Sequence, residues 1–94
     1  MDTNTAQEKD AERAERLAER VRAAQLPPPE ERLRIRRDAR VTLRDIADVL
    51  SVTPMTVHRW ESGEVQPRLD QAAAYARVLA KVQAATVRRE QAGA

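Results

Sequence analysis

The side chains best suited to recognising a partner lie on one face of residues 53–62. With about 100° of rotation per residue in a helix, that face mixes a cation, a titratable donor, an apolar group and a hydroxyl. A face that meets only water would more usually hold Glu, Lys and Gln. The outward side chains are Met55, His58, Arg59 and Ser62, and the inward ones are Val57, Trp60 and Glu61.

Arginine is the most informative residue of this outward face. Its forked guanidinium matches the O6 and N7 acceptors of guanine and the oxygens of phosphates. Of the 17 cationic residues, only Lys9 and Lys81 are lysines. Such a face is typical of a helix that enters the major groove of double-stranded DNA. The residues predicted to contact bases are Thr53, Pro54, Met55, His58 and Arg59.

Plainer interpretations of the same residues stay open. Met55 can be an isolated apolar residue on the surface, His58 a solvated histidine and Arg59 a solvated cation. Trp60 points inward and is predicted to belong to the core rather than to stack on a base.

Two short helices must position this face. Thr42 can cap the first, with Asp45 three residues later as in a capping box. Thr53 can cap the second, and Gly63 can end it in the left-handed conformation. Because only two residues separate the two helices, the sequence predicts a helix-turn-helix over residues 42–62.

Three longer helical segments flank this motif, at Ala6–Gln25, Pro29–Arg40 and Leu69–Arg89. Three consecutive prolines end the first, and no segment shows a strand pattern. The predicted fold is therefore all-α, with an N-terminal helical extension over 1–26 and a helix-turn-helix domain over 27–82. Residues 83–94 form the end of the last helix and a tail. The residues predicted to face inward are Ile35, Ala39, Ile46, Ala47, Leu50, Val52, Leu69, Ala72, Ala76, Leu79 and Ala80.

The stretch TLRDIADVLSVTPMTVHRWESG resembles the helix-turn-helix of the phage repressor and Cro family, the xenobiotic-response-element class of bacterial regulators. The resemblance covers about residues 30–80. It implies a lambda-repressor-like DNA-binding domain of four to five helices, here with an additional N-terminal helix and a long C-terminal helix. The matching residues are Ile35, Arg36, Thr42, Ile46, Ala47, Leu50, Val52, Thr53, Val57, Trp60, Glu61, Gly63, Pro67, Leu69, Ala76 and Leu79.

The resemblance also implies anchoring contacts to the DNA backbone. Arg44 and Arg68 match family positions near phosphates, and Arg40 and Thr56 are expected to make further phosphate contacts. Solvated charges are the alternative for the three arginines.

Other matching positions have structural roles in the family. Arg36 and Glu61 correspond to a pair that joins the first helix of the domain to the end of its third, while Trp60 and Gly63 pack and terminate that third helix. Two residues depart from the family pattern. Leu43 replaces a glutamine that contacts a phosphate, and Ser51 replaces a glycine where the turn requires a positive φ, at a cost of about 1 kcal/mol.

The first helix has a thin apolar stripe of Ala14, Leu17, Val21 and Ala24. That spacing matches a short coiled-coil seam, a helix on a neighbouring domain, or a helix that frays alone. A homodimer is expected, because one recognition helix covers only half of a palindromic site. Either the Ala6–Gln25 helix or residues 80–89 can make the twofold contact, and the first of these is also the expected surface for a protein partner.

Composition narrows the classes of function. The chain has no cysteine, one histidine and two glycines, which disfavours metal sites, thiol chemistry and phosphate-binding loops. No enzymatic activity, cofactor or membrane association is expected. The predicted function is a sequence-specific, double-stranded DNA-binding transcriptional regulator of bacterial or phage type, acting at the nucleoid in the cytoplasm. Because the net charge is only +2, DNA would be bound through placed residues rather than through bulk attraction. The alternative is an antitoxin-like or adaptor module that binds a protein through the same fold.

Overall fold

The computed structural model describes the backbone of residues 3–93 and the side chains of residues 5–89. Five helices follow one another in the chain: α1 (Thr3–Ala23), α2 (Pro29–Asp38), α3 (Leu43–Leu50), α4 (Pro54–Ser62) and α5 (Leu69–Gly93). Residues 3–93 contain no strand, so the predicted all-α class is confirmed.

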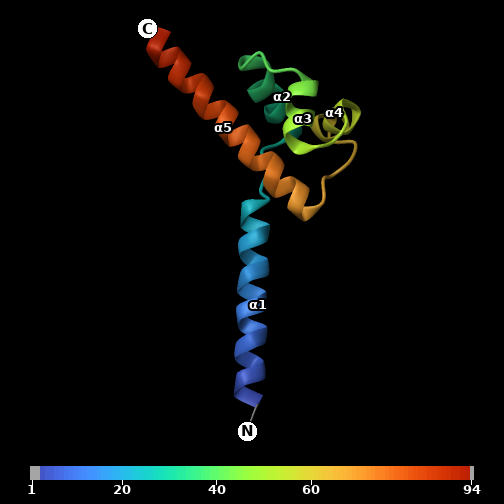
Figure 1. Ribbon diagram of the computed structural model, residues 1–94, viewed down its shortest axis with the longest axis vertical. Helices are drawn as coiled ribbons and strands as arrows, with labels where there is room; N and C mark the ends of the chain where they lie inside the picture. The colour runs from blue at the N-terminus through green and yellow to red at the C-terminus, as the bar shows by residue number, and fades with distance from the viewer. Residues whose placement is uncertain (1–2, 94) are drawn as a thin grey trace.

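The core lies where α5 packs against α2 and α3 and where Trp60 of α4 reaches α5 (Figure 1). The aromatic rings of Trp60 and Tyr75 pack there with their centroids 5.4 Å apart and their planes at 38°. Such a tilted pair stabilises the core beyond the area that it buries. The buried apolar residues are Ile35, Ile46, Ala47, Val57, Trp60, Ala72, Tyr75 and Leu79.

The inward face of α5 differs in part from the prediction. Ala72 and Leu79 are buried as expected, but Ala80 is exposed and Tyr75 is the most buried large side chain of the helix. Tyr75 lies between Ala72 and Leu79 at helical spacing, so these three residues form the packed face with Tyr75 at its centre. Ala80 follows Leu79 directly and therefore lies at the edge of that face. The helix also continues to Gly93 rather than ending at Arg89.

The predicted end of α2 at Arg40 is wrong, because the helix stops at Asp38. Arg40 adopts a left-handed φ of 58°, and the N–H of Val41 donates to the carbonyl of Arg36 at 3.2 Å. These are the features of a Schellman termination, which glycine usually marks. An arginine in that position gives no such signal in the sequence.

The start of α3 and the turn between α3 and α4 both have the predicted geometry. The Thr42 hydroxyl accepts from the Asp45 N–H at 3.0 Å, and the Thr42 N–H donates to the Asp45 carboxylate at 2.9 Å. This capping box fixes the start of α3. Ser51 has a φ of 56°, and the N–H of Val52 donates to the carbonyl of Ala47 at 3.0 Å. The strained serine predicted at the family's glycine position is therefore present.

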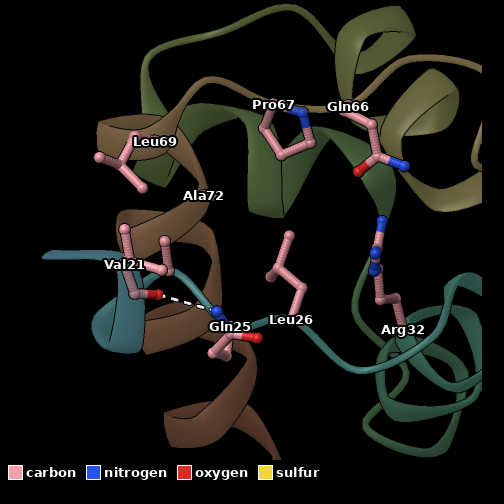
Figure 2. Close-up of a pocket in the computed structure, with 9 residues that line it drawn as sticks. Val21, Gln25, Leu26, Arg32, Gln66, Pro67, Leu69 and Ala72 are labelled. Carbon is pink, nitrogen blue, oxygen red and sulfur yellow. Dashed lines mark hydrogen bonds between the residues drawn. The ribbon is translucent and has the colours of Figure 1, made fainter. Parts of the chain in front are cut away.

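Helix α1 extends away from the other four helices, and the molecule measures 63 × 32 × 21 Å (Figure 1). It runs over Thr3–Ala23 rather than Ala6–Gln25, because the chain must become extended before Pro27. Of the other helices it contacts only α5, near Val21 and Leu69 (Figure 2). Most of its apolar stripe is nevertheless exposed, with Leu17 51% exposed and even Val21 42% exposed.

Candidate nucleic-acid interface

Helix α4 is fixed at both ends by residues that the sequence marks. The Thr53 hydroxyl accepts from the Thr56 N–H at 3.2 Å, and Pro54 occupies the first turn. Gly63 ends the helix with a φ of 80°. A Cβ atom at Gly63 would lie 3.2 Å from Cγ of Pro29, so glycine serves both the backbone conformation and the close approach to α2.

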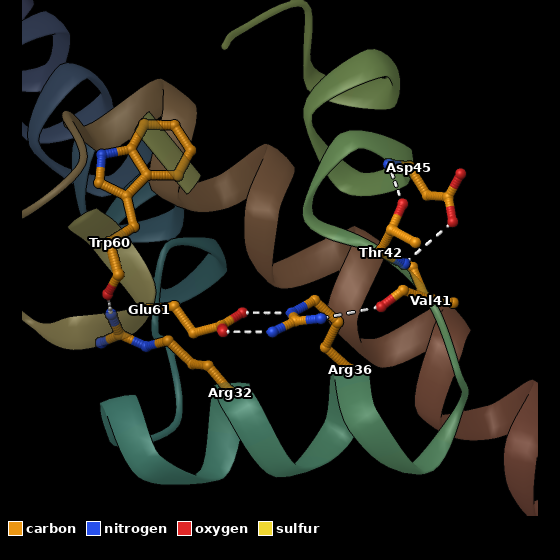
Figure 3. Close-up of polar contacts among 7 residues, drawn as sticks. All are labelled: Arg32, Arg36, Val41, Thr42, Asp45, Trp60 and Glu61. Carbon is orange, nitrogen blue, oxygen red and sulfur yellow. Dashed lines mark hydrogen bonds and ion pairs between the residues drawn. The ribbon is translucent and has the colours of Figure 1, made fainter. Parts of the chain in front are cut away.

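A buried ion pair holds α4 to α2 (Figure 3). Arg36 donates from Nε and Nη2 to the two carboxylate oxygens of Glu61, each at 2.7 Å. Only 14% of the Arg36 side chain and 5% of the Glu61 side chain are exposed. Arg36 also donates from Nη1 to the carbonyl of Val41 at 3.0 Å, which ties the α2–α3 connection to the same pair. The hydrogen bonds to Glu61 raise the pKa of Arg36, because they favour the charged guanidinium.

A second arginine, which the sequence did not reveal, holds the same carboxyl-terminal end of α4. Arg32 is 5% exposed and donates from Nη1 to the carbonyl of Trp60 at 2.8 Å. It also donates from Nε to the carbonyl of Pro27 at 2.7 Å. A cation at the carboxyl end of a helix is favoured by the helix dipole. Arg32 lies one turn before Arg36 on α2, and that spacing was the available signal for a shared face.

These contacts orient α4 so that its two faces separate as predicted. Val57, Trp60 and Glu61 are buried. Met55 is 56% exposed, and His58 and Arg59 are exposed as well. The inward side therefore meets the core, and the outward side is available to a partner. Contact of this outward side with DNA stays a prediction.

The hydroxyls of the two threonines near the start of α4 are hydrogen-bonded to each other. Oγ1 of Thr53 and Oγ1 of Thr56 lie 2.9 Å apart, with either able to donate. Because one of the two hydroxyl protons is used between them, the pair has one left for an outside acceptor such as a phosphate or base. Pro54 is half-buried beside them, so less of its ring is available than the sequence suggested.

The three predicted anchoring arginines are all exposed. Arg40 lies in the α2–α3 connection, Arg44 in the first turn of α3 and Arg68 just before α5. In Figure 1, α3 and α4 lie between the α2–α3 connection and the α4–α5 connection. Within residues 5–89, none of these three arginines forms an ion pair.

One more cation lies beside the outward face of α4. Arg37 lines a shallow depression together with His58, Ser62 and the half-buried Leu43. The sequence gives no signal for a role of Arg37, because only the packing of α2 against α4 brings Arg37 near His58. Leu43 packs against the core, so its side chain cannot make the phosphate contact that the resemblance assigns to a glutamine at this position.

The electrostatics of the α3 start are set locally. The Thr42 N–H lowers the pKa of the Asp45 carboxyl by donating to it, and the Thr42 hydroxyl acts in the same direction. Asp45 is thus held as a carboxylate beside the positive end of α3. In the described part of the chain, no three His, Cys, Asp or Glu side chains form a possible metal site. None of the described helices has an apolar stretch long enough to cross a bilayer.

The comparisons with known proteins agree with this geometry. A family model described as "Helix-turn-helix domain" matches residues 31–89. The match covers α2 from its third residue, all of α3 and α4, and most of α5. Since more than half of the chain is matched, the chain belongs to this helix-turn-helix family. No curated protein and no solved structure matches it.

Proposed function

We propose that this protein is a sequence-specific, double-stranded DNA-binding transcriptional regulator of the bacterial or phage repressor/Cro type. The observation that carries the proposal is the exposed face of α4, where Arg59, His58 and Met55 project from a helix whose other face is fixed by buried contacts. A rigid helix with a mixed, arginine-bearing face suits the major groove. The proposal requires no catalytic group and no cofactor.

The proposed contacts to DNA are of two kinds, those to bases and those to phosphates. Arg59 is the candidate for a forked bond to guanine, and Met55 and Pro54 are candidates for contact with a thymine methyl group. His58 and the Thr53 hydroxyl can add hydrogen bonds to base edges. The proposed phosphate contacts, which position the protein without selecting a sequence, are Arg40, Arg44, Thr56 and Arg68.

The proposal includes a homodimer on a palindromic site. One α4 covers half a site, and two copies about 34 Å apart would meet successive major grooves on one face of the duplex. The exposed stripe of α1 and the free end of α5 are the available twofold surfaces. A DNA-bound regulator of this kind would act at the nucleoid in the cytoplasm.

Selection of bound sequences from a random DNA pool tests the proposal. A recovered motif with two related halves supports sequence-specific binding by a dimer, and a single half-site supports a monomer. The selected duplex and a scrambled duplex are then compared by fluorescence anisotropy at several salt concentrations. Binding that prefers the selected duplex and weakens with salt supports the proposal. Absence of binding at low salt contradicts it.

The exposed α1 favours a second candidate, an antitoxin-like or adaptor module. Leu17 and Val21 form an uncovered apolar stripe on a helix that reaches away from the domain. In that case α1 would bind a protein and the outward face of α4 would be secondary. The salt titration separates the two candidates, because specific binding that weakens with salt favours the regulator and absence of DNA binding at low salt favours the adaptor.

A further inference from the structure

A groove lies where the end of α1 meets the start of α5 and the α4–α5 connection (Figure 2). Its volume is about 340 Å³, which is within the usual range of small-molecule sites. Leu26, Pro67 and Leu69 supply much of its apolar wall. Its polar side chains are those of Arg32, Gln66 and Gln25, all labelled in Figure 2.

Arg32 carries a buried charge that no carboxylate balances. Among residues 5–89, its two hydrogen bonds go to the neutral carbonyls of Pro27 and Trp60. These bonds use Nε and Nη1, so Nη2 has no hydrogen-bond partner in that part of the chain. Nη2 keeps contact with solvent, since it is not among the fully buried side-chain atoms that lack a partner in residues 5–89. A guanidinium whose protein partners are neutral carbonyls can form a charge-assisted bond to an anion at such an edge. The arrangement therefore favours an anion at the Nη2 edge.

The chemistry of the groove selects the kind of anion. No acidic residue lines it, and Arg32 is the one cation among its lining residues. A single guanidinium suits a monoanion, and its fork matches the geometry of a carboxylate. The Nε2 amide of Gln25 donates one of its two N–H groups to the carbonyl of Val21 at 2.9 Å, whereas Gln66 makes no side-chain hydrogen bond within residues 5–89 and is the freer second donor. The apolar wall formed by Leu26 and Leu69 suits a hydrocarbon group.

We propose that this groove binds a small organic carboxylate, with the carboxylate on Arg32 and Gln66 and the hydrocarbon body against Leu26 and Leu69. The site is separate from the outward face of α4, and the inference does not rest on DNA binding. A bound molecule would contact both α1 and α5. It would therefore hold the end of α1 against the domain, and amide exchange over residues 21–26 would slow.

The test is an NMR titration of the full chain with phenylacetate and hexanoate, each compared with its uncharged amide. The expected result is a saturable shift of backbone amides near Leu26, Gln66 and Leu69, with the carboxylates binding roughly fivefold or more tighter than the amides. Gln66→Glu places a like charge beside the ligand and should weaken carboxylate binding by a similar factor. Gln83→Glu is the matched control, because Gln83 is exposed and lies outside this groove.

Arg32→Lys keeps the charge but loses the fork, and it should also weaken carboxylate binding. Because Arg32 holds the end of α4, circular dichroism must show that this variant is folded, and Gln66→Glu provides the test if it is not. The proposal is overturned if the carboxylates cause no saturable shift, if the amides bind equally well, or if both glutamine variants bind the carboxylates like the parent chain.

Discussion

Helices α1 and α5 are the two long helices of this protein, at 21 and 25 residues, and both are rich in alanine. Helix α5 buries Ala72, Tyr75 and Leu79 against α2 and α3. Helix α1 leaves Leu17 about half exposed and contacts only α5. The comparison teaches that a long helical pattern predicts a helix but does not predict membership of the core. A core helix needs large apolar side chains on one face and other elements to cover them.

The ion pairs of the two regions differ in the same way. Arg36 and Glu61 are buried and joined by two bonds of 2.7 Å. Arg22 and Glu15 on α1 are joined at 2.8 Å, but their side chains are 62% and 64% exposed. Water screens the second pair, and neither partner is left buried when the other is removed. The distances are nearly equal, so burial decides what each pair contributes.

The largest expected effect is therefore on the buried pair. Glu61→Ala should lower the free energy of unfolding by about 3–5 kcal/mol, because it leaves Arg36 buried without its partner. Glu15→Ala, the matched change in α1, should cost no more than about 1 kcal/mol. Urea denaturation of both variants gives the comparison. Similar denaturation midpoints for the two would show that burial does not separate these pairs.

The next effect concerns DNA, and it contrasts arginines of the domain with one of α1. Arg59→Ala should lose about 1–3 kcal/mol on a selected site and much less on a scrambled duplex, because a forked base contact is lost. Arg59→Lys should be nearly as harmful, since a point charge cannot span both guanine acceptors.

Arg44→Ala and Arg68→Ala should instead weaken binding to both duplexes and reduce the salt slope by about one unit per lost phosphate contact. Arg20→Ala in the exposed part of α1 is the control and should leave both affinities unchanged. Anisotropy titrations at several salt concentrations measure all five variants. Equal losses on both duplexes for Arg59→Ala would make Arg59 an anchoring residue only.

A smaller effect comes from Tyr75, which has no counterpart in α1. Burial raises the pKa of the Tyr75 hydroxyl to about 12, and the nearby Glu61 carboxylate acts in the same direction. In the unfolded chain this pKa is about 10. The folded state therefore holds the proton more tightly, and the resulting stability is complete below about pH 10 and is lost as the pH rises through about 12.

Unfolding free energies measured across this window should fall by about 2 kcal/mol. Tyr75→Phe should remove that part of the pH dependence. Its hydroxyl is buried without a hydrogen-bond partner among residues 5–89, so the variant should be as stable as the parent at neutral pH, or more so by about 1 kcal/mol. An identical pH dependence in parent and variant would mean that Tyr75 ionises freely in the folded state.

The smallest effect is expected from shortening α1. Deletion of residues 1–20 should change the free energy of unfolding by less than about 1 kcal/mol, because the side chains of residues 5–20 are exposed except for the half-buried Ala18. Deletion of residues 1–26 should still give a folded domain but should cost about 1–2 kcal/mol more, since Leu26 packs against the core. Urea denaturation measures stability, and analytical ultracentrifugation measures any change of oligomeric state. Loss of folding in the shorter deletion would place α1 within the core.

The sequence alone determined the features that depend on near neighbours. The capping box of Thr42 and Asp45, the cap at Thr53 and the left-handed end at Gly63 all follow from residues within one turn of each other. The helical wheel of α4 also separates its buried and exposed faces, because the period of a helix is fixed by its backbone. Family resemblance added the pairing of Arg36 with Glu61, which are far apart in the chain.

Tertiary structure decided what depends on how the helices meet. It placed Tyr75 at the centre of the α5 face, brought Arg32 under the end of α4 and set Arg37 beside His58. It also left most of α1 uncovered, although the spacing of the apolar residues in this helix is typical of a packing surface. Local spacing tells which side chains share a face, but only the arrangement of helices determines which of those faces finds another to cover it.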